Sequence, residues 1–361
     1  MGLFDAALLA STIGLTVPIL LASVGELISE RAGVLNVGLE GMMLAGAFGA
    51  YWATWATGSL LLGALAGIGA GLLFGVIMAV LSVRLGADQV VSGVGINILA
   101  IGATTFAFNE IFGSREQISV DRIDTLAIPG LHELGGVGSA LFDQDPVTYL
   151  ALLSVPGAWY LLFRTKWCLS VRGAGEFPAA VDAAGVSVSR VRWLGVFAAA
   201  GCAGLAGAYL SIVEVGIFRQ EMSAGRGFLA LAAVIFGRWH PVGVLGACLL
   251  FGVADALQLR LQAEGSVPVE VWIVLAAGAV AALVVLIARR GVRGLGPLRL
   301  AVAIAGALAA IALLIADPFV SLPYQVWLAL PFVLALIALA STVGRARMPR
   351  ALTLAYHRGD A

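Results

Sequence analysis

Long apolar runs, each of about 20 residues and separated by short polar connections, recur along almost the whole chain. A run of this length crosses a bilayer as an α-helix, so the pattern predicts an all-α, polytopic transmembrane helical bundle with about 9–10 membrane segments. The two runs on either side of Arg238-Trp239-His240-Pro241 are each too short to span, which predicts a broken or re-entrant pair. The predicted segments are 6–24, 33–55, 59–82, 88–112, 146–163, 193–214, 227–237 with 242–258, 268–288, 298–316 and 324–343.

Composition agrees with this pattern. Of the 361 residues, 61% are hydrophobic and only 12% are charged, against roughly 25% charged in soluble domains. The formal net charge is zero, so we expect no nucleic-acid partner. The spacing of Cys168, Cys202 and Cys248 suggests neither a metal site nor a disulfide framework.

Motifs for catalysis are missing from the sequence. The phosphate-binding P-loop needs a Gly-Lys pair, but the single lysine, Lys166, follows Thr165. The three histidines lie in separate regions, and neither H-E-x-x-H nor G-x-S-x-G occurs. We therefore expect that the chain is not an enzyme and carries no cofactor of its own.

Basic residues set the expected orientation. They cluster in the connections 164–192 and 289–299 and in the tail 344–361, which places all three on the cytoplasmic side. The N-terminus, which has no basic residue, is then outside, and so is the polar stretch 113–145. We expect a multi-pass protein of the inner (cytoplasmic) membrane with a cytoplasmic C-terminus.

Two features point to specific contacts. Glycines at 63, 67, 71 and 75 fall on one helix face of segment 59–82 and predict a close packing seam, as do the glycines at 201, 204 and 207. The stretch Gly25–Ala47 concentrates polar side chains in an apolar setting, which persist in a membrane where function or a buried partner holds them. These side chains belong to Glu26, Glu30, Arg31, Asn36 and Glu40.

The polar connection 172–195 predicts a short helix between two membrane segments. Pro178 suits a first helical turn, Ala179 to Ala184 favours helix, and Gly185 favours its end. Ser187 or Ser189 can cap the helix that follows. A helix this short is unstable alone in water, so it rests either on lipid or, as we favour, in a groove of another protein.

Three stretches together resemble a known family. Gly25–Ala47, Arg172–Gly195 and Gly225–Gln258 are similar to blocks of the permease subunits of ABC importers, in the branch of ribose-type sugar, branched-chain amino acid and nucleoside permeases. The resemblance covers residues 8–290. The sequences ERAGVLNVGLEGMM and GRGFLALAAVIFGRWHP are most similar to those of the nucleoside-type permeases.

The resemblance implies an ATP-driven importer of a small polar solute, a nucleoside before a sugar or a branched-chain amino acid. A second, non-identical permease subunit, ATPase subunits that bind ATP and Mg²⁺, and an extracytoplasmic substrate-binding lipoprotein would complete it. Residues 1–297 would form the permease domain with its cytoplasmic coupling loop 164–192, followed by two further segments in 298–343 and the basic tail 344–361. The ATPase would dock on Gly175, Glu176, Pro178, Ala179, Asp182 and Gly185.

The same resemblance suggests a substrate path. Asn36 and Glu40 are four residues apart and are expected to share a helix face, where an amide and a carboxylate would suit a neutral polar ligand. Asn97 and Thr104 would line the path from segment 88–112. The alternatives are that Glu40 pairs with an arginine or a helix N-terminus, and that the other two form interhelical hydrogen bonds.

Phe228 and Trp239 are the aromatic candidates for the path, because every nucleobase offers a face for stacking, although either ring can equally serve packing. Glu26, Glu30 and Arg31 are expected to form structural ion pairs near a helix end. An ion-coupled carrier or channel is the alternative from a different functional class, because such proteins also use intramembrane carboxylates.

Overall fold

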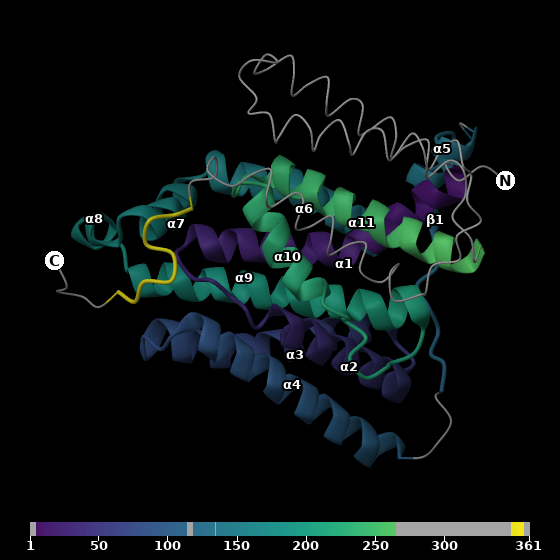
Figure 1. The fold of residues 1–361 in the computed structure, drawn as a ribbon, viewed down its shortest axis with the longest axis horizontal. Coiled ribbons are helices and arrows are strands. Elements are labelled where there is room, and N and C mark those ends of the chain that lie inside the picture. The colour runs from purple at the N-terminus through teal and green to yellow at the C-terminus, as the bar shows by residue number, and fades with distance from the viewer. Residues whose placement is uncertain (1–4, 114–117, 134, 265–347, 357–361) are drawn as a thin grey trace, which may run out of the picture.

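The computed structural model describes residues 5–113, 118–133, 135–264 and 348–356, which form a helical bundle with one short strand pair (Figure 1). The described elements are α1 (Ala6–Arg31), α2 (Leu39–Thr57), α3 (Leu60–Ala79), the π-helical turn η1 (Val80–Arg84), α4 (Gln89–Phe112), β1 (Leu126–Ala127), α5 (Gly135–Phe142), β2 (Asp143–Gln144), α6 (Pro146–Phe163), α7 (Lys166–Glu176), α8 (Pro178–Ala183), α9 (Val188–Ala208), the π-helical turn η2 (Tyr209–Val215), α10 (Arg226–Phe236) and α11 (Pro241–Glu264).

Six helices in this part of the chain are long and apolar enough to cross a membrane: α1, α3 with η1, α4, α6, α9 with η2, and α11. The predicted all-α, polytopic bundle is therefore confirmed. The predicted segments 268–288, 298–316 and 324–343 lie outside the described residues, so the total of about 9–10 segments and the division of the C-terminal part stay predictions.

Side-chain caps fix where several helices begin. Asp5 accepts a hydrogen bond from the backbone N–H of Leu8 at 3.0 Å, at the start of α1. Asp88 accepts from the N–H groups of Val90 and Val91, both at 2.9 Å, at the start of α4. The first N–H groups of a helix have no partner within it, so these acidic side chains stabilise the starts that the sequence marks.

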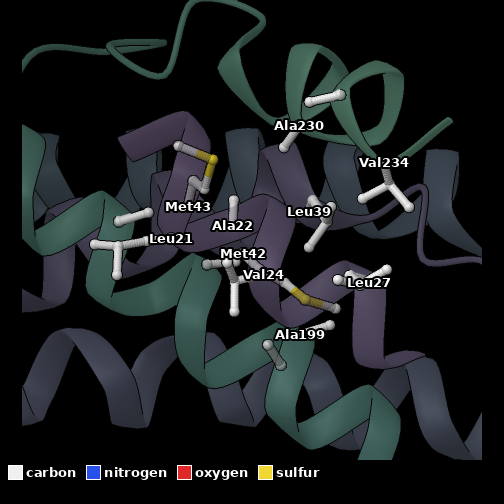
Figure 2. Packing of buried hydrophobic residues seen from close by; sticks show 14 of the residues in the cluster. Leu21, Ala22, Val24, Leu27, Leu39, Met42, Met43, Ala199, Ala230 and Val234 are labelled. Carbon is white, nitrogen blue, oxygen red and sulfur yellow. The ribbon is translucent and has the colours of Figure 1, made fainter. Parts of the chain in front are cut away.

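Helices α1 and α9 form the centre of the bundle. They pack on each other, α1 also contacts α10 and α11, and α9 also contacts α2 and α3. Helix α4 lies at the edge and exposes large apolar side chains such as Val91 and Phe106, as expected where lipid or another subunit covers them. Figure 2 shows part of the apolar centre, with Leu21, Ala22, Val24, Leu27, Leu39, Met42, Met43, Ala199, Ala230 and Val234.

The glycine stripe of α3 is a packing seam, as predicted. A Cβ atom added at Gly71 would collide with the carbonyl oxygen of Ala200 in α9 and would lie 2.7 Å from Cα of Gly204. A Cβ atom at Gly204 would lie 2.5 Å from the carbonyl oxygen of Gly67. The backbones of α3 and α9 can approach this closely only because neither has a side chain here.

The predicted break after α10 is present, but its second half differs from the prediction. Helix α10 has 11 residues and α11 has 24, which gives lengths of about 16 and 36 Å. Only α10 is too short to span, because α11 continues past residue 258 to Glu264. Its polar end suggested an earlier stop, yet Arg260 stays helical there and pairs with Asp5 at 2.7 Å. Arg238 and Trp239 form the break with φ of 55° and 53°.

The predicted coupling loop, residues 164–192, which we call the coupling segment, contains two helices, α7 and α8. The sequence predicted only α8. Helix α8 begins at Pro178, and Gly185 follows it in the left-handed conformation with φ of 82°, as predicted. It has six residues, fewer than two full turns. Helix α7 precedes it, and Ser187 caps α9 by accepting from the N–H of Arg190 at 3.4 Å.

The two ends of the bundle differ in structure (Figure 1). One end carries the last turn of α1, the helices α7 and α8, the start of α9, and residues 348–356. The other end carries the start of α1, α5, the antiparallel pair of β1 and β2, and the end of α11. The coupling segment and the described part of the basic tail therefore share one end, as the predicted orientation requires.

Candidate functional site

A cavity of about 420 Å³ lies between α2, α4 and the segment that leads into α10. Three of the predicted path residues, Glu40, Asn97 and Phe228, meet in its wall although they are far apart in the sequence. The volume falls in the range of small-molecule sites, roughly 300–1,000 Å³. The full lining is Glu40, Gly41, Leu44, Asn97, Ile101, Glu221, Ser223, Ala224, Gly225 and Phe228.

Glu40 joins the first turn of α2 to the start of α10. Its Oε1 accepts from the backbone N–H of Gly225 at 2.8 Å, and its Oε2 accepts from that of Gly227 at 2.7 Å. A carboxylate at a helix N-terminus is favoured by the free N–H groups and by the helix dipole. Glu40 therefore pairs with a helix N-terminus, which is one of the alternatives given from the sequence. It also lines the cavity. Each carboxylate oxygen keeps a lone pair that can accept from a ligand.

Asn97 holds α4 against α2. Its Oδ1 accepts from the N–H of Gly41 at 2.8 Å, and its Nδ2 donates to the carbonyl oxygen of Val37 at 3.0 Å. The amide nitrogen carries a second hydrogen that neither bond uses. Asn97 is therefore an interhelical hydrogen-bonding residue, one of the alternatives named from sequence, and it offers one further donor at the cavity wall.

Phe228 presents an apolar face beside these polar groups. Phe228 is 47% exposed, so the described residues cover only part of its ring. Within the cavity wall it stands near a loop of unusual backbone, in which Glu221 and Ala224 have φ of 57° and 48°. The sequence did not predict that this loop lines the cavity, although its Gly225-Arg226-Gly227 run indicates a turn.

Asn36 does not share a helix face with Glu40, and this prediction was wrong. Helix α2 begins only at Leu39, and Asn36 lies in the connector after α1. Its Oδ1 accepts from the N–H of Gly38 at 3.1 Å, a local bond that favours a turn over helix. The side chain is fully buried and does not line the cavity.

The predicted ion pairs among Glu26, Glu30 and Arg31 do not form. Glu26 Oε1 accepts from the N–H of Asn36 at 2.8 Å, and Glu30 Oε2 accepts from Nε1 of Trp239. Arg31 Nε donates to the carbonyl oxygen of Trp239 at 3.0 Å. The side chains of Glu26, Glu30 and Arg31 thus bind the connector before α2 and the break before α11. Those buried segments lack secondary-structure partners for their polar backbone groups.

Trp239 and Thr104 lie away from the cavity. Trp239 is 4% exposed and is enclosed with Glu30 and Arg31 at the break. Thr104 is 5% exposed and donates its hydroxyl to the carbonyl oxygen of Ala100 in its own helix. Among the described residues the cavity thus unites three of the six predicted path residues and leaves Asn36, Thr104 and Trp239 in buried structural positions.

The predicted docking residues divide into three groups by their exposure. Gly175 is buried beneath α1, where an added Cβ would collide with the carbonyl oxygen of Arg31. Ala179 and Gly185 are exposed, and no residue of α8 is buried. Helix α8 is therefore accessible to a partner, whereas Gly175 transmits contact from α7 to the end of α1. Glu176, Pro178 and Asp182 are half-buried.

A continuous set of contacts joins the cavity to α8. Asn97 binds Val37 of the connector, which begins directly after α1. At the start of that connector, a Cβ on Gly33 would lie 3.2 Å from the carbonyl oxygen of Ala174 in α7. Helix α7 leads into α8 after Glu176. These contacts place α7, which precedes α8, against the connector that leads into α2 and the cavity wall.

Comparison with known proteins finds clear relatives. Residues 8–288 match the family described as "Branched-chain amino acid transport system / permease component". The putative glucose ABC transporter permease protein TsgC13 of Haloferax volcanii is 43% identical over 264 residues, which cover 72% of this chain and 79% of that protein. The guanosine ABC transporter permease protein NupQ of Bacillus subtilis is 38% identical over 260 residues, covering 69% and 81%.

A third relative, the nucleoside ABC transporter permease protein NupC of Lactococcus lactis, is 36% identical over 252 residues, which cover 66% of this chain and 78% of that protein. No solved structure matches the chain.

Proposed function

Because this chain belongs to the family of permease components of the branched-chain amino acid transport system, we propose that it forms one half of the pore of an ATP-driven importer and that the cavity lies on the path of a nucleoside. The observation that carries the substrate class is the cavity wall, which places a carboxylate, an amide and a half-exposed phenyl ring around one space.

The wall offers complementary groups for each part of a nucleoside. The ribose hydroxyls donate to the free lone pairs of Glu40, and the amide of Asn97 donates to an acceptor on the ligand. The base stacks on the ring of Phe228, an interaction worth about 1–3 kcal/mol per base. Relatives named as guanosine and nucleoside permeases support this class. A relative named as a putative glucose permease supports a sugar as the second candidate.

Energy for uphill import comes from outside the chain. A ligand alone shifts an equilibrium only by its differential affinity for two states, so accumulation needs a coupled reaction. Partner ATPases bind ATP and Mg²⁺, dock on α8, and move the connector through the contacts of α7 and α1. A second permease subunit completes the pore, and an extracytoplasmic lipoprotein delivers the substrate. In this arrangement α8 and residues 348–356 face the cytoplasm.

Competition for uptake tests the substrate class. We expect guanosine to compete for uptake by the assembled complex in membrane vesicles, and ribose, glucose and leucine not to. Replacing Phe228 by Ala should raise the KM for guanosine roughly tenfold, because base stacking is lost. The matched control is Phe106→Ala, since Phe106 is an exposed phenylalanine of α4 outside the cavity. Competition by sugar alone, with no effect of Phe228→Ala, would favour the sugar candidate.

A further inference from the structure

Residues 348–356, which we call the C-terminal strap, lie against α7 and α9 (Figure 1, yellow). The backbone N–H of Ala351 donates to the carbonyl oxygen of Gly175 in α7 at 2.8 Å. Nη1 of Arg192, near the start of α9, donates to the carbonyl oxygen of Leu354 at 2.7 Å. The strap is therefore joined to both helices that flank α8, by a backbone bond to α7 and by the Arg192 side chain of α9.

The strap is also part of the packed structure. Ala351 and Leu352 are 4% and 7% exposed, and Leu352 belongs to the main apolar core. Arg192 is 2% exposed, and its Nε and Nη2 have no hydrogen-bond partner among the residues that the structure describes. Within the described chain, the carbonyl oxygen of Leu354 is the acceptor that this guanidinium reaches. Loss of the strap would remove this acceptor from the Arg192 guanidinium.

Helix α8 depends on such neighbours for its orientation. It has six residues, none of them buried, and a helix of this length does not persist on its own in water. The hydroxyl of Tyr356 donates to Oδ2 of Asp182 in α8 at 3.3 Å. The guanidinium of Arg350 lies 5.1 Å from the ring centre of Phe177, directly before α8. The strap and the start of α8 also form the walls of one groove of about 480 Å³.

The backbone of the strap is itself held by these contacts. Thr353 has φ of 67°, a left-handed conformation that a β-branched residue rarely adopts without support from its surroundings. It lies between Leu352 in the core and Leu354 at Arg192, so the unusual turn directs both contacts. Thr353 is exposed, so a substitution there changes the turn without removing a packed side chain.

We propose that the C-terminal strap is a positioning element that fixes the orientation of α8, so that a push on α8 is transmitted to the bundle. The proposal rests on the proposed function of α8 as the contact for the ATPase. The strap adds a part of the chain far from the coupling segment in sequence, and Tyr356 and Arg350 are its positioning residues. Without the strap, α8 would reorient under load and ATP hydrolysis would be uncoupled from import.

Two substitutions at Thr353 form a matched test. Thr353→Pro fixes φ near −65° and is incompatible with the turn, whereas Thr353→Gly accepts a positive φ without strain. Both are made in the full chain and assembled with its partner subunits. A nitroxide label on an Ala183→Cys variant, with the three native cysteines replaced by Ala, reports the mobility of α8. Import per ATP hydrolysed is measured in vesicles with whichever of guanosine, glucose or leucine the wild-type complex imports.

We expect Thr353→Pro to raise the label mobility and to lower import per ATP about fivefold, the effect of losing one typical hydrogen bond. Thr353→Gly should change neither. Tyr356→Phe, which removes only one hydroxyl, should show the same changes to a smaller extent. Unchanged label mobility in Thr353→Pro would overturn the proposal that the strap fixes the orientation of α8. Raised mobility with unchanged import per ATP overturns instead the coupling role of α8, and the transport role of the strap with it.

Discussion

Two polar regions of this bundle arise from the same short stretch of sequence and differ in what surrounds them. Glu40 is half-buried at the wall of an open cavity, with lone pairs free toward that space. Glu26 and Glu30, which precede Glu40 by 14 and 10 residues, are fully buried and bind the connector and Trp239. An intramembrane carboxylate therefore does not by itself mark a substrate path. Glu40 differs from the other two in having bonding capacity beside open space, and this is why we propose it for the path.

The difference predicts different consequences for substitutions. In the closed region around Trp239, water cannot replace a lost partner, so a change acts on stability. At the cavity, water can enter, so a change acts mainly on transport. Substitutions in the two regions should therefore differ in whether they change stability or transport.

The largest expected effect is on stability, from Trp239→Ala in the closed region. Replacing a buried tryptophan by alanine leaves a cavity and costs about 3–5 kcal/mol. Denaturation of the purified protein in detergent measures it. Trp52→Ala is the control, because Trp52 is 44% exposed. If Trp239→Ala unfolded like the wild type and changed only the KM, Trp239 would belong to the substrate path after all.

Glu30→Ala should have the next largest effect, about 1–3 kcal/mol of lost stability, because Nε1 of Trp239 is left buried without an acceptor. Glu30→Gln keeps a carbonyl oxygen as acceptor and should lose less. The same denaturation assay compares the two variants. Equal losses in both would show that the hydrogen bond to Trp239 is not what Glu30 contributes to stability.

At the cavity, Glu40→Gln should cost about 1 kcal/mol of stability, because one N–H of the α10 start then faces an amide N–H₂ instead of a carboxylate oxygen. The KM for guanosine should rise about fivefold, since an acceptor for the solute is lost. Uptake kinetics of the assembled complex measure this effect. A loss of stability with an unchanged KM would make Glu40 a helix cap and nothing more.

The smallest effect belongs to the partly exposed ion pair of Asp5 and Arg260, which lies in neither region. The hydrogen bonds from Arg260 hold the pKa of Asp5 well below its ordinary value. A lowered pKa in the folded state adds stability above the unfolded pKa, and this is lost as the pH falls through the folded pKa. Asp5→Asn should therefore lower the melting temperature slightly at neutral pH and not at strongly acidic pH. A difference that persisted in acid would show that the ion pair with Arg260 is not the cause of the effect.

Local features of the fold could be predicted from sequence. Pro178 and Gly185 bound α8, and the glycine stripe of α3 packs closely, because these features depend on a few adjacent residues or on one helix face. Asn36 was misplaced, since four-residue spacing implies a shared face only if the helix includes both residues. Its side chain instead bonds to Gly38 and turns the chain before α2 begins.

Long-range partners could not be predicted. Glu40 meets Gly225 and Gly227, which are 185 and 187 residues away, and Glu30 meets Trp239 at a separation of 209. Nothing in the local sequence distinguishes these two glutamates, since both lie in apolar surroundings. The strap is a further case, because nothing local to residues 348–356 shows that they return to the coupling segment.

The double bond of Glu40 to the start of α10 has a mechanical consequence. Charge-assisted hydrogen bonds are roughly twice as strong as neutral ones, and here two of them tie α2 to α10. Asn97 joins α4 to the same region through neutral bonds only. If the cavity widens during transport, we therefore expect these two bonds to keep the start of α10 attached to α2.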